Sequence, residues 1–268
     1  MCLTEETTDI LYRLRAGDRV VGVPGYVWRP REARQKPRIS TFISARYDRI
    51  DALAPDLVLA FSDLQAGMVA ELIRRGHHVM TFNQRSIDEI YRTIGLIGGL
   101  IGASDEATHL CGNLAQGLAA VKMSASRFPA RPKVFFEEWP DPLISGIRWV
   151  EEIVEAAGGD PIFPVLRDKA LAPNRIVTEE DVRRASPDVI IASWCGRRVR
   201  KPEILARPGW NEIPAVKHGH VFEIRSTYIL QPGPMALTEG ARQIHAMLCR
   251  AVGVPVLPPF TPDEPGDW

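Results

Sequence analysis

One short phrase occurs twice in the chain, and it constrains the fold more than any other feature. Residues 54–61 read Ala-Pro-Asp-Leu-Val-Leu-Ala-Phe, and residues 186–193 read Ser-Pro-Asp-Val-Ile-Ile-Ala-Ser. In both copies a Pro-Asp pair introduces an aliphatic run of the length expected for a strand buried on both faces. Each copy follows a segment with helical periodicity, which is typical of parallel α/β sheets. The repeat therefore predicts two similar α/β lobes.

The longest helical pattern of the chain lies between the two copies. It starts at Ser104, keeps leucines at helical spacing and ends at Phe128, before Pro129. Apolar runs alternate with amphipathic segments on both sides of it. We therefore expect an α/β protein of two Rossmann-like lobes joined by this helix, with an N-terminal lobe over 1–103, a linking helix over 104–128, a C-terminal lobe over 129–254 and a proline-rich tail over 255–268.

The same patterns predict the individual elements. Helices are expected over residues 4–14, 47–53, 65–75, 104–128, 150–157, 178–184 and 235–251, and a further helix is expected to begin at residue 87. Strands are expected over residues 19–23, 57–61, 78–82, 133–136, 187–193 and 221–224.

Composition narrows the class of protein. The 33 basic and 33 acidic side chains give a net charge of zero, which argues against a nucleic-acid binder. The apolar runs are too short to span a membrane. The four cysteines are scattered without a CxxC pair, so neither a zinc ribbon nor a disulfide framework is indicated. The acidic first residues do not resemble a secretory leader, so we expect a cytoplasmic protein, or a periplasmic one if the N-terminus is truncated.

The sequence lacks the common enzyme signatures. It contains no Walker loop, no HExxH and no GxSxG, and no GxGxxG follows the first strand. His218 and His220 flank a turn glycine, where a solvated turn is favoured over a metal site, so we predict no metal ligand. Glu137 and Glu138 end a strand, where a hydrogen-bonding role is favoured over acid–base work. We therefore expect a protein without catalytic activity and without a required cofactor.

Aromatic side chains gather at the ends of the predicted strands, although the chain has only six Trp, five Tyr and nine Phe residues. An aromatic-lined cleft with a few polar groups suits a large, flat ligand. The predicted ligand-binding residues are Trp28, Phe61, Phe82, Asn83, Gln84, Trp139, Arg148, Trp194 and Tyr228.

Several longer segments carry a family resemblance when they are taken in order. They are LTEETTDILYRLRAGDRVVGV, IDALAPDLVLAFSDLQ, FNQRSIDEI, EEWPDPLISGIRWVEEIVEAAGGD, SPDVIIASWCGRR, RPGWNEIPAVKHGHVFEI and QPGPMALTEGARQIHAML. With them the chain resembles the class III substrate-binding proteins of cobalamin and siderophore ABC importers, most closely the cobalamin-binding branch. The resemblance implies two α/β lobes bridged by a long helix, with the ligand bound between them.

The resemblance also implies a protein partner. In the best-known members, one surface glutamate on each lobe docks onto arginines of the importer's membrane subunits. The second-lobe position matches Glu180, whereas the first-lobe position falls near Ala66, where no acid stands.

These observations lead to one principal hypothesis and leave two alternatives open. The principal hypothesis is a protein that captures a corrinoid (cobalamin-like) or a related metal chelate, for uptake or salvage. The first alternative is a chelatase-like or other tetrapyrrole-processing enzyme on the same fold, with Glu137, Glu138 and Cys195 as its candidate residues. The second is a siderophore-binding or haem-binding protein.

Overall fold

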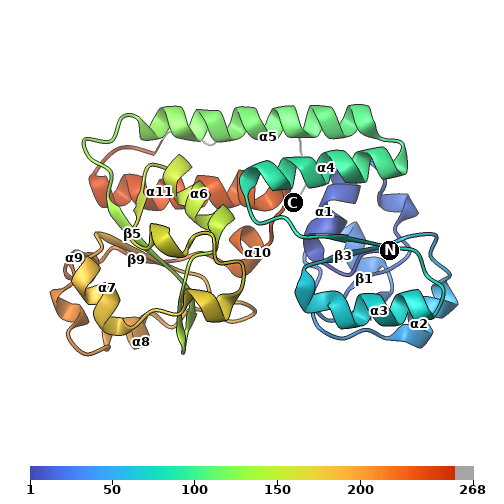
Figure 1. Cartoon of the computed structure of the whole chain (residues 1–268). Coiled ribbons are helices and arrows are strands. Elements are labelled where there is room, and N and C mark those ends of the chain that lie inside the picture. Colours follow the sequence, from blue (N-terminus) through green and yellow to red (C-terminus); the bar gives the residue numbers. More distant parts are fainter. Residues whose placement is uncertain (257–268) are drawn as a thin grey trace. The chain divides into compact units, whose positions relative to one another are not determined.

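The computed structural model describes residues 1–256 of the chain, which divide into two compact units. Among these residues, unit 1 comprises 1–84 and 88–113, and unit 2 comprises 85–87 and 114–256. The division falls inside the long helix α5 (Ser104–Ala125), so this helix contributes residues to both units (Figure 1). The predicted tail over 255–268 lies outside the described residues from position 257 onward.

Unit 1 is built on short parallel strands covered by helices. Its strands are β1 (Val23–Pro24), β2 (Arg38–Ser40), β3 (Val58–Phe61) and β4 (Val79–Phe82). Its helices are α1 (Glu5–Arg13), α2 (Tyr47–Leu53), α3 (Ala66–Arg74) and α4 (Ile87–Ile101), of which the first residue of α4 is grouped with unit 2.

The first residues of the chain complete the sheet of unit 1. The Leu3 N–H donates to the Leu59 carbonyl of β3 at 2.9 Å, and the Cys2 N–H donates to the Gly22 carbonyl, next to β1, at 3.0 Å. β3 in turn pairs in parallel with β4. Since β1 also pairs in parallel with β2, the resulting order is β2, β1, residues 1–3, β3 and β4, in which the segment that comes first in the chain lies between β1 and β3.

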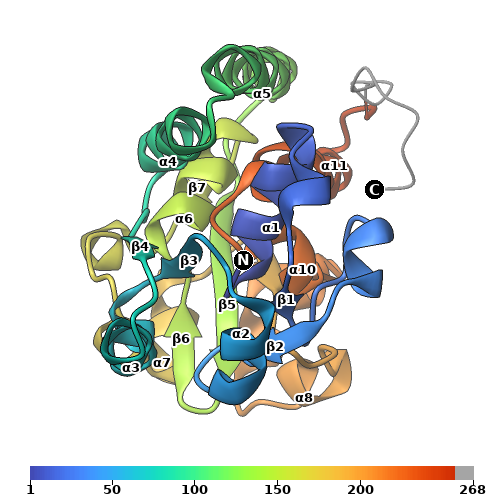
Figure 2. The ribbon, with the colours of Figure 1, turned by 90° about the vertical axis from the view of Figure 1, so that its right-hand side faces the viewer.

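Unit 2 repeats the order of the last four of these segments, and its first strand is longer than any strand of unit 1. Its strands are β5 (Lys133–Pro140), β6 (Leu143–Ser145), β7 (Asp160–Pro161), β8 (Val189–Ala192) and β9 (Val221–Glu223). Its helices are α6 (Arg148–Ala156), α7 (Glu179–Ala185), α8 (Lys201–Leu205), α9 (Pro214–Lys217), α10 (Ser226–Ile229) and α11 (Ala241–Val252). β7, β5, β8 and β9 are parallel in that order, and β6 folds back antiparallel beside the end of β5 (Figure 2).

The duplicated phrase forms the same backbone structure in both units. β3 and β8 each consist of four buried residues. The residue before each Pro-Asp pair, Ala54 in unit 1 and Ser186 in unit 2, ends its helix in the left-handed region, with φ of 40° and 52°. The prediction of two similar α/β lobes from this phrase is confirmed.

Most predicted elements are confirmed to within a few residues, and three differ for local reasons. The predicted strand over 19–23 is wrong, because residues 17–19 form a 3₁₀ turn that leaves only Val23–Pro24 in β1. β5 continues four residues beyond its predicted end because these residues pair with β6. The last helix begins with a π-helical turn at Ala236–Gly240 before α11 continues it.

Each unit has its own apolar core. The core of unit 1 includes Leu3, Ile39, Ile50 and Leu72, and that of unit 2 is larger and includes Phe135, Trp194 and Trp210. Within residues 1–256, the structure contains no helix with the length and apolarity needed to cross a membrane.

Candidate functional site

The predicted ligand residues are distributed over both units. Unit 1 carries Trp28, Phe61, Phe82, Asn83 and Gln84, and unit 2 carries Trp139, Arg148, Trp194 and Tyr228. Their assembly into one ligand site stays a prediction.

Two phenylalanines close the strand ends of unit 1. Phe61 and Phe82 are the last residues of β3 and β4, and they are paired in register. Their exposed fractions are only 5% and 4%. Gln84 is also buried, whereas Asn83 is exposed and lines a hollow of about 400 Å³ beside α3. In this unit, Asn83 is therefore the predicted strand-end residue that is open to solvent, and the two phenyl rings are core side chains.

A neutral amide organises the turn after β3. The Gln65 carbonyl oxygen accepts the Phe61 N–H at 3.0 Å, and its amide nitrogen donates to the Phe42 carbonyl at 2.9 Å. The intervening Ser62 has a φ of 74°, a left-handed conformation that costs free energy in a residue other than glycine. Sequence analysis did not identify Gln65, because its two backbone partners cannot be read from a linear pattern.

Trp28 is the most exposed of the predicted aromatic residues. Its ring is 46% exposed, and the Arg34 guanidinium lies 4.4 Å from the ring centroid. The backbone N–H of Trp28 donates to Glu5 Oε1 at 2.8 Å. Glu5 was not a predicted site residue, because an acidic side chain in the first turn of a helix is already explained by the helix dipole. This pair of contacts presents an aromatic face at the surface of unit 1.

Trp194, by contrast, is a core residue of unit 2. It has no exposed surface, and its indole N–H donates to Glu137 Oε1 at 3.0 Å. Trp139 is only half-buried, and its indole N–H donates to the Asp141 carbonyl at 2.9 Å. The Arg197 guanidinium lies 5.3 Å from the Trp139 ring. The packing therefore favours Trp139 over Trp194 as a ligand contact, and the role of both stays a prediction.

Two ion pairs hold the carboxylates of Glu137 and Glu138 in the second half of β5. Arg207 donates to both oxygens of the fully buried Glu137, at 2.6 and 2.9 Å. Arg175, which is 1% exposed, donates to both oxygens of Glu138 at 2.7 and 3.0 Å. A carboxylate engaged in this way is poorly placed for acid–base catalysis. Both glutamates have the hydrogen-bonding role that the sequence favoured.

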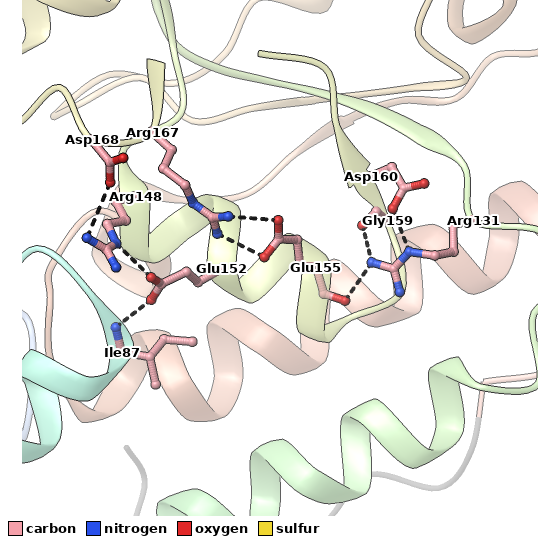
Figure 3. Close-up of polar contacts among 9 residues, drawn as sticks. All are labelled: Ile87, Arg131, Arg148, Glu152, Glu155, Gly159, Asp160, Arg167 and Asp168. Carbon is pink, nitrogen blue, oxygen red and sulfur yellow. Dashed lines mark hydrogen bonds and ion pairs between the residues drawn. The ribbon is translucent and has the colours of Figure 1, made fainter. Parts of the chain in front are cut away.

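Arg148 starts α6 within a network of carboxylates (Figure 3). Its Nε donates to Glu152 Oε1 at 2.8 Å, and its Nη1 lies 3.3 Å from Asp168 Oδ1. The second oxygen of Glu152 accepts the Ile87 N–H at 2.7 Å. The hydrogen bond with Glu152 raises the pKa of Arg148, which is therefore charged. Its side chain is 43% exposed, so it is oriented but still open to an acceptor group of a ligand.

The same face of unit 2 carries two further arginines (Figure 3). Arg167 donates to both oxygens of Glu155 at 3.0 and 2.8 Å. Arg131 pairs with Asp160 at 2.5 Å and also donates to the Gly159 carbonyl at 2.6 Å. These bonds lie at the last turn of α6 and just after it, at the opposite end of the helix from Arg148. No linear pattern indicates these pairs, because the partners are 12 and 29 residues apart in the chain.

The remaining predicted residues lie on short helices. Tyr228 is half-buried in α10, and Glu180 is exposed on α7. Arg183 contacts the Glu180 carboxylate at 2.5 Å, so a partner arginine would share it. Ala66 is the exposed first residue of α3 and lines the same hollow as Asn83.

Metal-binding groups are dispersed. Within residues 1–256, no three His, Cys, Asp or Glu side chains are placed to hold a metal ion together. The His218 and His220 rings are 5.8 Å apart, tilted by 48° and at the surface. The four cysteines, all of them among residues 1–256, form no disulfide bond with one another.

Comparison with known proteins identifies relatives over most of the chain. Residues 1–228 match the family described as periplasmic binding protein. An uncharacterised ABC transporter substrate-binding lipoprotein of Bacillus subtilis (strain 168) is 28% identical over 256 residues, covering 90% of this chain and 77% of the relative. A vitamin B12-binding protein of Vibrio parahaemolyticus is 24% identical over 246 residues, covering 88% of this chain and 84% of the relative. Among solved structures, a periplasmic heme-binding protein from Roseiflexus sp. RS-1 matches with a TM-score of 0.79 at 21% identity, over 94% of this chain and 97% of that chain.

These matches decide several predictions. The resemblance to substrate-binding proteins and the predicted fold class are confirmed. The chelatase-like alternative has no support, because the matched family and relatives are binding proteins. The expected cytoplasmic location is not supported either, because the family is described as periplasmic and the Bacillus relative as a lipoprotein.

Proposed function

The chain belongs to the family of periplasmic binding proteins, and we propose that it captures a corrinoid, a cobalamin-like macrocycle, for an ABC importer. The observation that carries the choice of ligand is the alignment with vitamin B12-binding relatives over 88% of this chain. The corrinoid is the transported ligand, and we expect binding to require no further cofactor. The role in substrate binding follows from the family, whereas the corrinoid as the ligand is our proposal.

The exposed side chains suit such a ligand. The half-exposed ring of Trp28 offers an apolar face to a flat macrocycle, and burying an aromatic side chain contributes roughly 1.5–3 kcal/mol. Asn83 and Arg148 are exposed polar groups that would bond the amide and carboxylate side chains of a corrinoid. We assign Trp139 and Tyr228, both half-buried, to the edge of the same site.

The proposal also includes a partner and a location. The importer's membrane subunits would dock on unit 2 through Glu180, which is 51% exposed. On unit 1 they would meet the exposed Ala66 in place of an acid. We propose that the protein works on the outer side of the cytoplasmic membrane, as its relatives' descriptions indicate.

Titration with corrinoids tests the ligand directly. Cyanocobalamin and aquocobalamin are titrated into the protein and followed by visible absorbance and calorimetry, with haem and a ferric siderophore as competing ligand classes. We expect a corrinoid Kd on the order of 1 μM or lower, corresponding to about −8 kcal/mol. Absence of heat and of spectral change with both corrinoids overturns the proposal. Tighter binding of haem or of the siderophore would assign the protein to that ligand instead.

Variants of exposed residues test the site. Trp28→Ala is expected to weaken corrinoid binding by about tenfold or more, because it removes an aromatic contact. Ile43→Ala is the matched control, since Ile43 is 72% exposed on the same unit and outside the predicted site. Equal affinities of the two variants would contradict the role of Trp28. Trp194→Ala is unsuitable as a probe, because truncating a fully buried tryptophan costs about 3–5 kcal/mol of stability by itself.

A further inference from the structure

A buried carboxyl group lies beneath the loop that carries Trp28. Glu5 is the first residue of α1 and is only 6% exposed. Its Oε1 accepts the backbone N–H of Trp28 at 2.8 Å, although 22 residues separate the two along the chain. A first-turn glutamate of a surface helix normally points into water. Here it fixes the backbone of Trp28, the most exposed of the predicted aromatic ligand residues.

The charged groups around Glu5 compete with one another. Glu6 and Asp9 lie on the same helix and are 4% and 5% exposed, while Arg29 lies in the Trp28 loop and is 7% exposed. Burial raises the pKa of Glu5 to about 8, against the opposing effects of the Trp28 N–H and of Arg29. Glu5 therefore changes between its protonated and ionised forms around pH 8.

The two protonation states hold the loop with different strength. An ionised carboxylate makes a shorter hydrogen bond to a backbone N–H, roughly twice as strong as that of a neutral carboxyl group. It also attracts Arg29, the neighbour of Trp28 in the same loop. Ionisation thus anchors the loop, and protonation loosens it. A loop that is fixed before binding loses less conformational entropy when the ligand arrives.

We propose that Glu5 is a positioning residue of the ligand site, which sets the place of the Trp28 ring through the Trp28 amide and makes ligand affinity rise with pH. The inference rests on the proposed function in so far as Trp28 touches the ligand. The coupling between Glu5 and the Trp28 loop does not depend on it. Two separate measurements follow from this distinction.

The first measurement needs no ligand. The fluorescence of Trp28 is obtained as the difference between the protein and its Trp28→Phe variant, and it is recorded from pH 6 to pH 9. We expect this difference to titrate with a midpoint near pH 8, the pKa of Glu5. The inflection should vanish in Glu5→Gln, which keeps a carbonyl acceptor, and persist in Glu32→Gln, an exposed glutamate of the same unit. A flat titration of the unmodified protein overturns the inference even if Glu5→Gln does not fold, and an inflection that survives in Glu5→Gln does so as well.

The second measurement is the Kd for cyanocobalamin at pH 6.5, 7.5 and 8.5. We expect the affinity to rise by about 3- to 10-fold over this range in the unmodified protein and in Glu32→Gln, and to stay constant in Glu5→Gln. Affinity that rises equally in Glu5→Gln, or that is independent of pH in all three proteins, overturns the proposed role of Glu5 in the site. A normal fluorescence titration without corrinoid binding at any pH overturns the proposed ligand and leaves the coupling between Glu5 and Trp28 intact.

Discussion

The helices α1 and α6, one in each unit, end in the same turn with different residues. The Ala16 N–H donates to the Leu11 carbonyl at 2.9 Å, and the Gly159 N–H donates to the Val154 carbonyl at 2.9 Å. The residue before each donor is left-handed: it is Arg15 in unit 1, with φ of 58°, and Gly158 in unit 2, with φ of 104°. The two turns thus share their backbone conformation and hydrogen bond, although the left-handed residue is an arginine in one and a glycine in the other.

The two units also stabilise their central strands differently. Behind β3 of unit 1 the neutral amide of Gln65 bonds the backbone at 2.9 and 3.0 Å. In unit 2 the indole N–H of Trp194, two residues after β8, donates to the side chain of Glu137 on β5, which forms a buried ion pair with Arg207. Substitution of Gln65 would remove two hydrogen bonds of a neutral amide, which lowers stability moderately. Substitution of Arg207 would leave the buried charge of Glu137 without its partner, which lowers stability more. Unit 2 should therefore be the more sensitive of the two to single substitutions.

The largest effect is expected from Arg207→Ala. It leaves the carboxylate of the fully buried Glu137 without its guanidinium and should lower the free energy of unfolding by about 3–5 kcal/mol. Urea unfolding followed by circular dichroism measures it. Arg200→Ala is the control, because its pair with Glu203 is exposed and should contribute at most about 1 kcal/mol. Equal losses in the two variants would mean that the burial of the pair between Glu137 and Arg207 does not make unit 2 sensitive to substitution.

The second effect concerns the left-handed turn of unit 2. A Cβ at Gly158 would lie 2.6 Å from Phe128 Cε2 and 2.9 Å from Ala125 Cβ. Gly158→Ala should therefore cost about 2–4 kcal/mol, from left-handed strain and overpacking together. Gly102→Ala separates the two contributions, because Gly102 has a φ of 70° and nothing within 4 Å of its added Cβ. It should cost only about 1–2 kcal/mol in the same unfolding experiment, and a cost as high as that of Gly158→Ala would exclude the packing argument.

The repeat explains how much of the fold the sequence could predict. Buried strands such as β3 and β8 are recognisable because every residue is apolar and a Pro-Asp pair precedes each strand. The wrong strand over 19–23 also contains three valines, which favour a strand, but the Val20 N–H is bonded to the Gly17 carbonyl in a turn. Composition cannot distinguish these outcomes, since the difference depends on which backbone partner is nearest in space.

The site was less predictable than the fold. Trp28 and Trp194 look alike in sequence, since both are tryptophans after an apolar run, yet one is 46% exposed and the other fully buried. Trp194 packs in the apolar core of unit 2, and its indole N–H is satisfied there by Glu137, 57 residues away. Glu5 and Gln65 were missed for the same reason, because their importance comes from backbone groups that only the folded chain brings to them.

The third effect concerns the pH dependence of stability, which a buried carboxyl group of unit 2 should influence. Glu151 on α6 is 3% exposed, its Oε2 has no hydrogen-bond partner among the described residues, and burial raises its pKa to about 8. In the unfolded chain its pKa is about 4.3. The folded protein thus retains a proton that the unfolded chain releases between these values. Glu151 therefore makes stability fall as pH rises from about 4.3 to about 8, by at most about 1.4 kcal/mol per unit.

Glu151→Gln should reduce this slope. Thermal or urea unfolding of the protein and of the variant at pH 5, 6, 7 and 8 gives the difference in stability, which is expected to shift in favour of the variant as pH rises. The slope is the readout, because a constant offset from the new amide does not affect it. Glu106→Gln is the control, since Glu106 is exposed on α5, and it should leave the slope unchanged. A slope that is the same in all three proteins would mean that Glu151 is ionised in the folded state.

The smallest effect is expected at Arg15, which occupies in unit 1 the turn position that Gly158 occupies in unit 2. Arg15 is exposed, and its left-handed conformation costs about 1–2 kcal/mol in a residue with a Cβ. Arg15→Gly removes that strain but adds conformational freedom to the unfolded chain, so we expect a net gain of about 0.5–1 kcal/mol. Arg15→Ala keeps the Cβ and should gain nothing, which separates the backbone effect from the loss of charge. If both variants were stabilised equally, the arginine side chain and not the turn would be the source of strain. If Arg15→Gly lost stability while Arg15→Ala did not, the left-handed conformation of Arg15 would not be a source of strain, although the two turns have the same hydrogen bond.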